Sequence, residues 1–315
     1  MKGKTVLITG ATGLIGSTLV KYLAGYKCHL ILPVRDIPKA KSMFSAIPDI
    51  TYIEHDFSKA QELGINNRVD YIIHAACPTT SLFMVENPVE TIDTIINGTR
   101  SILEFAKKSN IKGMVYLSSM EVYGEILDDS IPVKEDIQGF VNPLAARSSY
   151  PMGKRMAESL CYAYYKEYNV PVTIARLTQT FGPGVRVMSD NRIFAQFARC
   201  AINGNDIELA TKGGTKRMYL HTYDAVDAII CMLKNGEPGN AYNVANDDSY
   251  ISILEMAEFV RSQYNPKIKV IFKQKDQHEY LNEIHLRLST EKIRHLGWVP
   301  KYSLRDMFDS IINVY

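Results

Sequence analysis

Three glycines directly after an apolar run constrain the fold of this 315-residue chain more than any other feature. The run Thr5–Thr9 is rich in β-branched residues, as expected of a strand buried on both faces. Gly10, Gly13 and Gly16 follow it, and residues 14–24 carry apolar side chains at helical spacing. Glycine there permits a tight turn, close approach of the backbone to a pyrophosphate, and close packing of helix on strand. The pattern predicts that a helix N-terminus binds the phosphates of a dinucleotide. The predicted contacts are Gly10, Thr12, Gly13, Leu14, Ile15 and Gly16.

The rest of the first half repeats this alternation of strand and helix. Further strands are expected at 29–34, 51–54, 71–74, 114–117 and 172–175, and helices at 89–108 and 149–168. Such a βαβ series predicts an α/β fold, a Rossmann-type doubly wound parallel sheet covered by helices on both faces.

After about residue 178, segments with Gly and Pro separate shorter elements. We therefore expect a dinucleotide-binding domain over 1–178, to which part of 217–245 returns. Residues 179–315 are expected to form mainly a smaller C-terminal substrate-binding lobe. That lobe would lie over the carboxyl ends of the strands, where open α/β sheets bind their ligands.

The end of the second expected strand bears on the choice between NAD and NADP. An acidic residue there binds the ribose 2′-hydroxyl of NAD, whereas a basic one accommodates the 2′-phosphate of NADP. Here Val34 occupies the usual acidic position and Arg35 follows it, so NADP is slightly favoured. The alternative is that Arg35 pairs with Asp36 or stacks on adenine. Asp56 and Phe57, after the third strand, are placed to contact the adenine edge.

Two segments carry residues suited to hydride and proton transfer. Tyr150 and Lys154 lie four residues apart, so a helix places them on one face. A lysine ammonium near a phenol lowers its pKa from about 10 toward neutrality. The phenolate could then take a hydroxyl proton while a hydride leaves the same carbon for a nicotinamide. Ser119, in the segment SSMEVYG after the expected strand at 114–117, would hydrogen-bond the reacting oxygen.

Further segments extend these motifs nearly from end to end of the chain. They are TGATGLIG (9–16), HAACP (74–78), NPVETI (87–92), NGT (97–99), SSMEVYG (118–124), YPMGK (150–154), ARLTQTFGPG (175–184), KRMYLHTYDAVDAI (216–229) and LGWVPKYSL (296–304). With them the chain resembles the extended short-chain dehydrogenase/reductase family, specifically its NAD-dependent epimerase/dehydratase group. Residues 76–92 and 148–168 look most like those of UDP-glucuronate decarboxylases.

The resemblance implies that a nucleotide sugar is oxidised transiently at C4 and then epimerised or decarboxylated, after which the hydride returns. It places Glu121 near C5 of the sugar, as a base or a positioning group. It also implies that Ala75, Ala76 and Lys154 contact the cofactor. The residues implied on the substrate side are Cys77, Gln179, Arg192 and Arg217. Met120 and Gln179 depart from the family pattern, which usually has an acid and an asparagine there.

Two other functions stay open at this point. One is a net NADP-dependent carbonyl reductase of the same family, which Arg35 supports. The other is a non-catalytic protein that senses a dinucleotide. The intact set of Ser119, Tyr150 and Lys154 argues against a sensor, which needs none of them.

Composition bears on partners, location and metals. Lys plus Arg number 36 and Asp plus Glu 34, so the net charge of +2 predicts neither nucleic acid nor a membrane surface as partner. No run of about 18 apolar residues exists, and the five cysteines are scattered. A cytoplasmic protein with reduced thiols is expected. No metal site is expected either, because His278 and His285 lack a third strong ligand.

The helix expected at 149–168 also bears on assembly. Its tyrosines Tyr162, Tyr164, Tyr165 and Tyr168 suit core packing or a dimer face. Because members of the resembling family often pair through this helix, we expect a homodimer.

Overall fold

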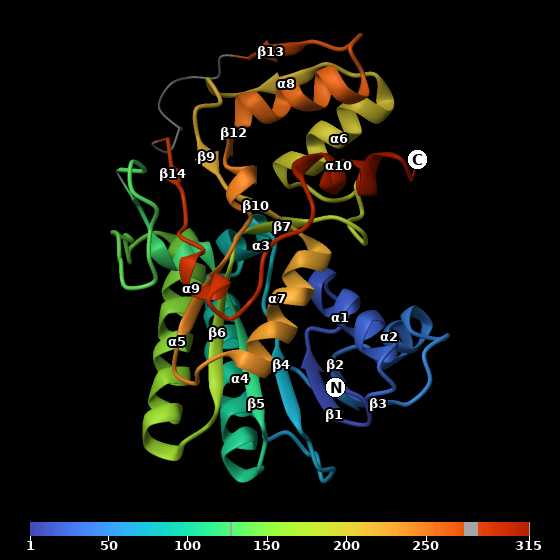
Figure 1. Ribbon diagram of the computed structural model, residues 1–315, viewed down its shortest axis with the longest axis vertical. Coiled ribbons are helices and arrows are strands. Elements are labelled where there is room, and N and C mark those ends of the chain that lie inside the picture. The colour runs from blue at the N-terminus through green and yellow to red at the C-terminus, as the bar shows by residue number, and fades with distance from the viewer. Residues whose placement is uncertain (127, 274–282, 315) are drawn as a thin grey trace.

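The computed structural model describes residues 1–126, 128–273 and 283–314, and its centre is one parallel sheet (Figure 1). The seven strands run in the order β11-β6-β5-β4-β1-β2-β3, and every pairing is parallel. They are β1 (Thr5–Thr9), β2 (His29–Val34), β3 (Ile50–Glu54), β4 (Tyr71–His74), β5 (Gly113–Ser119), β6 (Val172–Leu177) and β11 (Ala241–Val244). The order reverses between β1 and β4, so the sheet is doubly wound as expected.

The strand boundaries follow the sequence pattern closely. β1, β2 and β4 have the expected limits, and β3 begins one residue earlier. β5 and β6 both extend further, and Ser118 and Ser119 pair with Arg176 and Leu177 there. Because the strands are parallel, the segments that follow β1 to β6 meet at one edge of the sheet.

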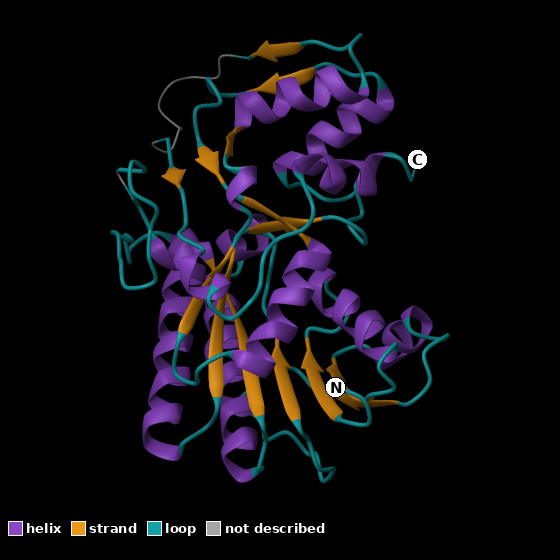
Figure 2. Cartoon of the chain, viewed as in Figure 1, coloured by secondary structure: helices purple, strands orange, loops and turns teal. Residues whose placement is uncertain are grey.

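Helices cover both faces of the sheet (Figure 2). One apolar cluster joins α1 (Leu14–Ala24), α2 (Ile37–Met43) and α7 (Thr222–Asn235) to one face. Another joins α4 (Pro88–Lys108) and α5 (Ser149–Tyr168) to the opposite face. The shorter helices are α3 (Ser81–Glu86), α9 (Glu291–Arg294) and the 3-10 helices η1 (Met120–Tyr123), η2 (Ala146–Ser148) and η3 (Asp247–Ser249).

A second region, the upper lobe, lies beyond the carboxyl ends of the strands (Figure 1). Its strand pairs are β7 (Gln179–Phe181) with β10 (Tyr219–His221), and β8 (Ile207–Leu209) with β13 (Val270–Phe272). A small sheet places β9 (Lys216–Arg217) between β12 (Ile251–Ser252) and β14 (His285–Leu286). The helices are α6 (Ile193–Asn203), α8 (Ile253–Tyr264) and α10 (Leu304–Ile312).

The upper lobe has an apolar core of its own. The ring of Phe181 stacks on Phe194 with centroids 4.2 Å apart and meets Phe308 edge-on at 5.1 Å. Val260 and Met307 complete this packing from α8 and α10. β7 follows the carboxyl end of β6 along the chain, and its Phe181 side chain is part of this core.

No helix among the described residues is long and apolar enough to cross a membrane. Within the same residues, no group of three or more His, Cys, Asp or Glu side chains could hold a metal ion. His278 lies outside the described residues, and His285 Nδ1 lies 3.6 Å from Asp129 Oδ2.

Candidate active site

The loop between β1 and α1 has a geometry that only glycine allows at two positions. Gly10 has φ +65°, and a Cβ there would lie 2.6 Å from the Ala75 carbonyl oxygen. A Cβ on Gly16 would lie 2.1 Å from the Gly10 carbonyl oxygen. Gly13 is the N-cap of α1, where no side chain caps the helix and no acid occupies the first turn. The N–H groups of this turn are thus available to an anion, so the loop fits a dinucleotide pyrophosphate.

The segment after β4 forms a fixed wall beside this loop. Thr9 Oγ1 accepts hydrogen bonds from Ala75 N and Ala76 N, both at 3.0 Å. The Thr9 hydroxyl therefore donates its hydrogen bond to His74 Nδ1, 2.7 Å away. His74 Nε2 in turn donates to Thr99 Oγ1 at 3.3 Å. Burial, aided by the charge of Lys154, lowers the pKa of His74 to about 3, so the ring is neutral. Ala75 and Ala76 can offer a ligand their surfaces and carbonyls, because their N–H groups are already bonded.

Arg35 lies exposed at the end of β2. Its neighbour Asp36 caps α2 by accepting a hydrogen bond from Lys39 N at 2.9 Å. Among the described residues Arg35 forms no ion pair with Asp36, so the alternative that these two side chains pair with each other is wrong. Burial opposes ionisation of Asp56, yet hydrogen bonds from Ser58 and the charge of Arg35 hold its pKa below the usual range. Arg35 thus faces the carboxylate that follows β3.

The Phe57 side chain is part of the core. Its ring centroid lies 4.5 Å from that of His55 and 5.9 Å from that of His74. A Cβ on Gly98 of α4 would lie only 3.1 Å from Phe57 Cβ. Only the backbone of Phe57 is therefore suited to the expected contact with adenine.

The Tyr150 and Lys154 side chains project from α5 toward the end of β5. Lys154 Nζ donates to the Leu117 carbonyl at 2.7 Å and lies 5.8 Å from the Tyr150 ring centroid. Burial, together with the nearby Cys77 and Glu121, raises the pKa of Tyr150 well above its ordinary value. This direction is opposite to the one expected from Lys154, because burial outweighs the opposing effects in this arrangement.

Ser119 and Arg147 moderate the pKa of Tyr150, and both also bond Glu121. Ser119 Oγ accepts from Glu121 N at 3.2 Å, and Arg147 Nη2 donates to Glu121 Oε1 at 2.8 Å. Hydrogen bonding by Ser119 and the charge of Arg147 both lower the Tyr150 pKa, against the effect of burial. Arg147 was not predicted from the sequence to belong to the site. Its signal was a cation three residues before Tyr150, but only the fold shows that it pairs with Glu121.

Cys77 belongs to the same group of side chains. Burial raises the pKa of its thiol, and the charge and hydrogen bonding of Lys154 oppose that rise. Because the nucleophilic form of cysteine is the thiolate, a protonated Cys77 is better suited to lining the site than to acting as a nucleophile.

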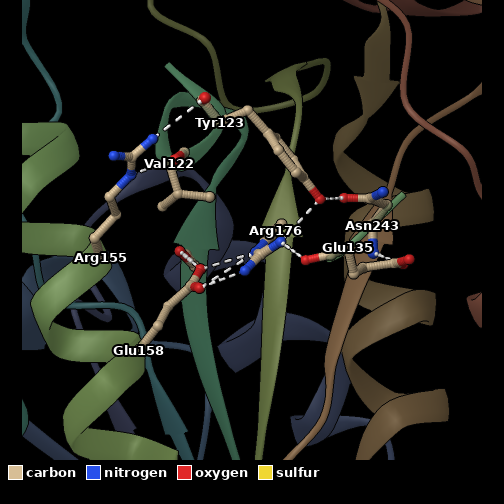
Figure 3. Close-up of polar contacts among 8 residues, drawn as sticks. Val122, Tyr123, Glu135, Arg155, Glu158, Arg176 and Asn243 are labelled. Atoms are coloured by element: carbon tan, nitrogen blue, oxygen red, sulfur yellow. Dashed lines mark hydrogen bonds and ion pairs between the residues drawn. The ribbon is translucent and has the colours of Figure 1, made fainter. Parts of the chain in front are cut away.

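A buried polar network supports the segment that carries Ser119 and Glu121 (Figure 3). Arg176 Nη2 on β6 pairs with Glu158 Oε2 on α5 at 2.7 Å, and Glu158 Oε1 accepts from Ser118 Oγ at 2.5 Å. Arg176 Nη1 also donates to Tyr123 Oη at 3.0 Å, and Tyr123 donates to Asn243 Oδ1 of β11 at 2.5 Å. Strands and helices distant in sequence are thereby tied together around η1.

Arg155 extends this support from α5 to the chain after η1. Its Nε donates to the Val122 carbonyl at 2.7 Å, and its Nη2 donates to the Gly139 carbonyl at 2.8 Å. Sequence reasoning missed Arg155, Arg176 and Glu158, because their importance depends on partners from other elements.

The residues expected on the substrate side differ in what they can offer. Gln179 lies in β7, paired with Tyr219 of β10. Arg192 donates from Nε and Nη2 to Asp190 and from Nη1 to the Thr180 carbonyl, which leaves little of its charge for a diphosphate.

Arg217 lies in β9, next to Met218. The Met218 side chain packs with Met120 and Val122, on either side of Glu121. Within the described ranges the Arg217 guanidinium makes no hydrogen bond to another residue, so it is freer than Arg192.

A family model described as NAD dependent epimerase/dehydratase family matches residues 6–245. The chain belongs to this family. UDP-glucuronic acid decarboxylase 5 of Arabidopsis thaliana is 30% identical over 308 residues, covering 96% of this chain and 86% of that protein. This epimerase/dehydratase-family member is therefore an enzyme, and the resemblance drawn from its motifs is confirmed.

Solved structures share the fold of this NAD dependent epimerase/dehydratase-family enzyme. A mutant UDP-glucuronic acid 4-epimerase from Bacillus cereus, in complex with UDP-4-deoxy-4-fluoro-glucuronic acid and NAD, superimposes with a TM-score of 0.81. It is 20% identical, with 98% of each chain covered. RMD from Pseudomonas aeruginosa, complexed with NADPH, has a TM-score of 0.79 and 22% identity, again with 98% of each chain covered.

Proposed function

We propose that the enzyme is a nucleotide-sugar epimerase or decarboxylase that acts through a transient 4-keto sugar. The observation that carries this proposal is the convergence of Ser119, Tyr150 and Glu121 at the carboxyl end of β5. Ser119 hydrogen-bonds the Glu121 backbone and lowers the Tyr150 pKa. The glycine loop at Gly10 lies on the same edge of the sheet. A nicotinamide bound there would supply the hydride chemistry, accepting a hydride from C4 and returning it.

The protein's own groups would move the proton at O4. Ser119 Oγ and Tyr150 Oη would hold the C4 oxygen in line, and Tyr150 would take its proton as C4 is oxidised. The ammonium of Lys154, held by the Leu117 carbonyl, would stabilise the phenolate through its positive charge. In the return step Tyr150 would give the proton back to O4, and the protonated phenol favoured by burial suits that step.

Glu121 would act at the next carbon, C5. A 4-keto group makes the C5 proton acidic, and Glu121 could remove and replace it. In a 4-keto uronate the same carbonyl lets the carboxylate leave as CO₂, and the resulting enolate takes a proton at C5. The relatives named UDP-glucuronic acid decarboxylase support a uronate as substrate.

The proposal is tested with purified enzyme and UDP-glucuronate. We expect the products to be either UDP-pentose and CO₂ or an epimerised UDP-uronate, identified by mass spectrometry and proton NMR. No net consumption of added nicotinamide nucleotide is expected. Tyr150→Phe should abolish turnover yet still bind the cofactor, as measured by fluorescence titration. Turnover retained in Tyr150→Phe would refute the proposal.

Arg35 favours a second candidate, a net NADP-dependent carbonyl reductase. Its exposed guanidinium suits a 2′-phosphate, and NADP is slightly favoured over NAD for that reason. The Asp56 carboxylate lies close enough to Arg35 for their charges to interact, and its negative charge would repel a 2′-phosphate, which favours NAD instead. Denaturing the protein and identifying the released nucleotide by mass separates the two: tightly held NAD supports the hydride-recycling enzyme. Reversible NADPH binding with stoichiometric oxidation supports the reductase.

A cytoplasmic homodimer is part of the proposal. Val89 and Ile92 on α4, and Met152, Met156 and Tyr162 on α5, are exposed apolar side chains on two helices that pack together. Tyr164, by contrast, is buried in the protomer core. Light scattering on the purified protein should give twice the monomer mass.

A further inference from the structure

The Arg147 guanidinium has a bonded side and an unbonded side. Nη2 donates to Glu121 Oε1 at 2.8 Å. Nη1 is buried, and it has no hydrogen-bond partner among the residues that the structure describes. Buried N–H groups without a partner are rare, and each of them calls for an explanation, such as a catalytic role or a bound water or ion. The unbonded side of Arg147 is therefore a candidate binding group.

The Arg147 guanidinium lies beside the candidate catalytic side chains. η2, which carries Arg147, leads directly into α5. The guanidinium carbon lies 5.5 Å from the Tyr150 ring centroid. Arg147 lowers the pKa of Tyr150 and Glu121 raises it, so both charges act on the same phenol. A sugar with O4 at Tyr150 would bring C5 and its substituent close to this pair.

The planar guanidinium presents two edges that suit carboxylates. Glu121 takes one edge, and its negative charge alone would repel an anionic substituent. With Arg147 beside it the pair has no net charge, and Nη1 can still donate. A neutral hydroxymethyl group would give Nη1 only a weak acceptor.

We propose that Arg147 determines specificity by binding a carboxylate carried on C5 of the substrate sugar. This inference rests on the proposed function, since it uses the same site and the same sugar orientation. It assigns the substrate to the nucleotide uronates on the basis of a residue of this chain.

The test measures binding of UDP-glucuronate and UDP-glucose by calorimetry, with the cofactor-loaded protein in a Tyr150→Phe background to prevent turnover. We expect tighter binding of UDP-glucuronate, and Arg147→Gln should weaken that binding about 10- to 100-fold while changing UDP-glucose binding little. Arg147→Lys should recover part of the lost affinity, because it restores the charge without the planar fork.

Glu121→Gln is the matched control, because it removes the other half of the pair. It should leave UDP-glucuronate binding unchanged or tighter, since a like charge is lost and Arg147 stays. If Arg147 only positioned Glu121, Arg147→Gln and Glu121→Gln would act alike on both sugars, which would overturn the inference.

Circular dichroism and cofactor affinity unchanged from the parent would show that the variants fold. Arg147-dependent uronate binding by an enzyme that turns over no nucleotide sugar would contradict the proposed function and support the inference. Turnover by the parent enzyme, together with equal binding of both sugars that Arg147→Gln does not change, would support the proposed function and contradict the inference.

Discussion

The buried ion pair between Arg176 and Glu158 predicts an asymmetry that can be measured. Their side chains are 11% and 10% exposed, and Nη2 of Arg176 lies 2.7 Å from Oε2 of Glu158. Arg176→Met would leave the Glu158 carboxylate buried with only Ser118 as donor, and would remove donors to Tyr123 and Glu135. Removing one partner of such a pair costs about 3–5 kcal/mol of unfolding free energy.

Removing both partners should cost much less than the two single losses combined. The double variant Arg176→Met with Glu158→Leu leaves no unpaired charge, and apolar side chains of similar volume need no desolvation. We expect its stability to lie within about 2 kcal/mol of the parent. If Glu158→Leu alone costs as much as Arg176→Met alone, the coupling energy would be at least about 4 kcal/mol, above the range of about 0.5–3 kcal/mol usual for residues in contact.

Urea unfolding provides the assay. Trp298 is the single tryptophan and is buried in the cluster that joins α1 and α7 to the sheet. Its fluorescence should be followed beside far-ultraviolet circular dichroism, and coincident transitions justify a two-state analysis. Arg176→Lys serves as the control that keeps the charge without the fork. A single-variant loss below about 1 kcal/mol, or additive losses in the double variant, would refute the reasoning.

Three further predictions concern other parts of the site. Gly16→Ala should abolish dinucleotide binding in a fluorescence titration, because its Cβ would meet the Gly10 carbonyl oxygen at 2.1 Å; Gly25→Ala, at the other end of α1, should bind as the parent does. His74, with a pKa of about 3 against an ordinary 6.5, stays neutral in the fold while the unfolded chain takes up its proton. The free energy of unfolding should therefore fall as pH drops from about 6.5 toward 3, and this group should contribute up to about 1.4 kcal/mol per pH unit. If the urea midpoints of the parent and of His74→Gln changed in parallel across that range, this prediction would be wrong. Arg35→Glu should weaken NADP binding at least about tenfold relative to NAD, and an unchanged affinity ratio would show that Arg35 does not contact the 2′-phosphate.

The elements of the sheet could be predicted because their signals are local. Apolar runs bounded by glycine or polar residues gave β1, β2 and β4 their observed limits. Tyr150 and Lys154 share a helix face because four residues make about one turn. Local spacing was thus sufficient for β1 to β6 of the central sheet, though not for β11, and for the side on which the two side chains lie.

The interactions of the site could not be predicted in the same way. The bond from Lys154 to the Leu117 carbonyl and the pair of Arg147 with Glu121 join α5 and η2 to the end of β5. The raised pKa of Tyr150 follows from burial, which no spacing reports. These features depend on tertiary contacts between segments many residues apart, so the sequence indicated the residue types and not their partners.

The path of the chain between the sheet and the upper lobe has a mechanical consequence (Figure 1). The chain leaves the sheet after β6, returns with α7 and β11, leaves again for β12 and α8, returns with α9, and ends in α10. A single protease cut in any one connection would leave the others intact. Neither part can be released as a separate fragment by one cleavage, and force applied to the upper lobe would be shared among all of these connections.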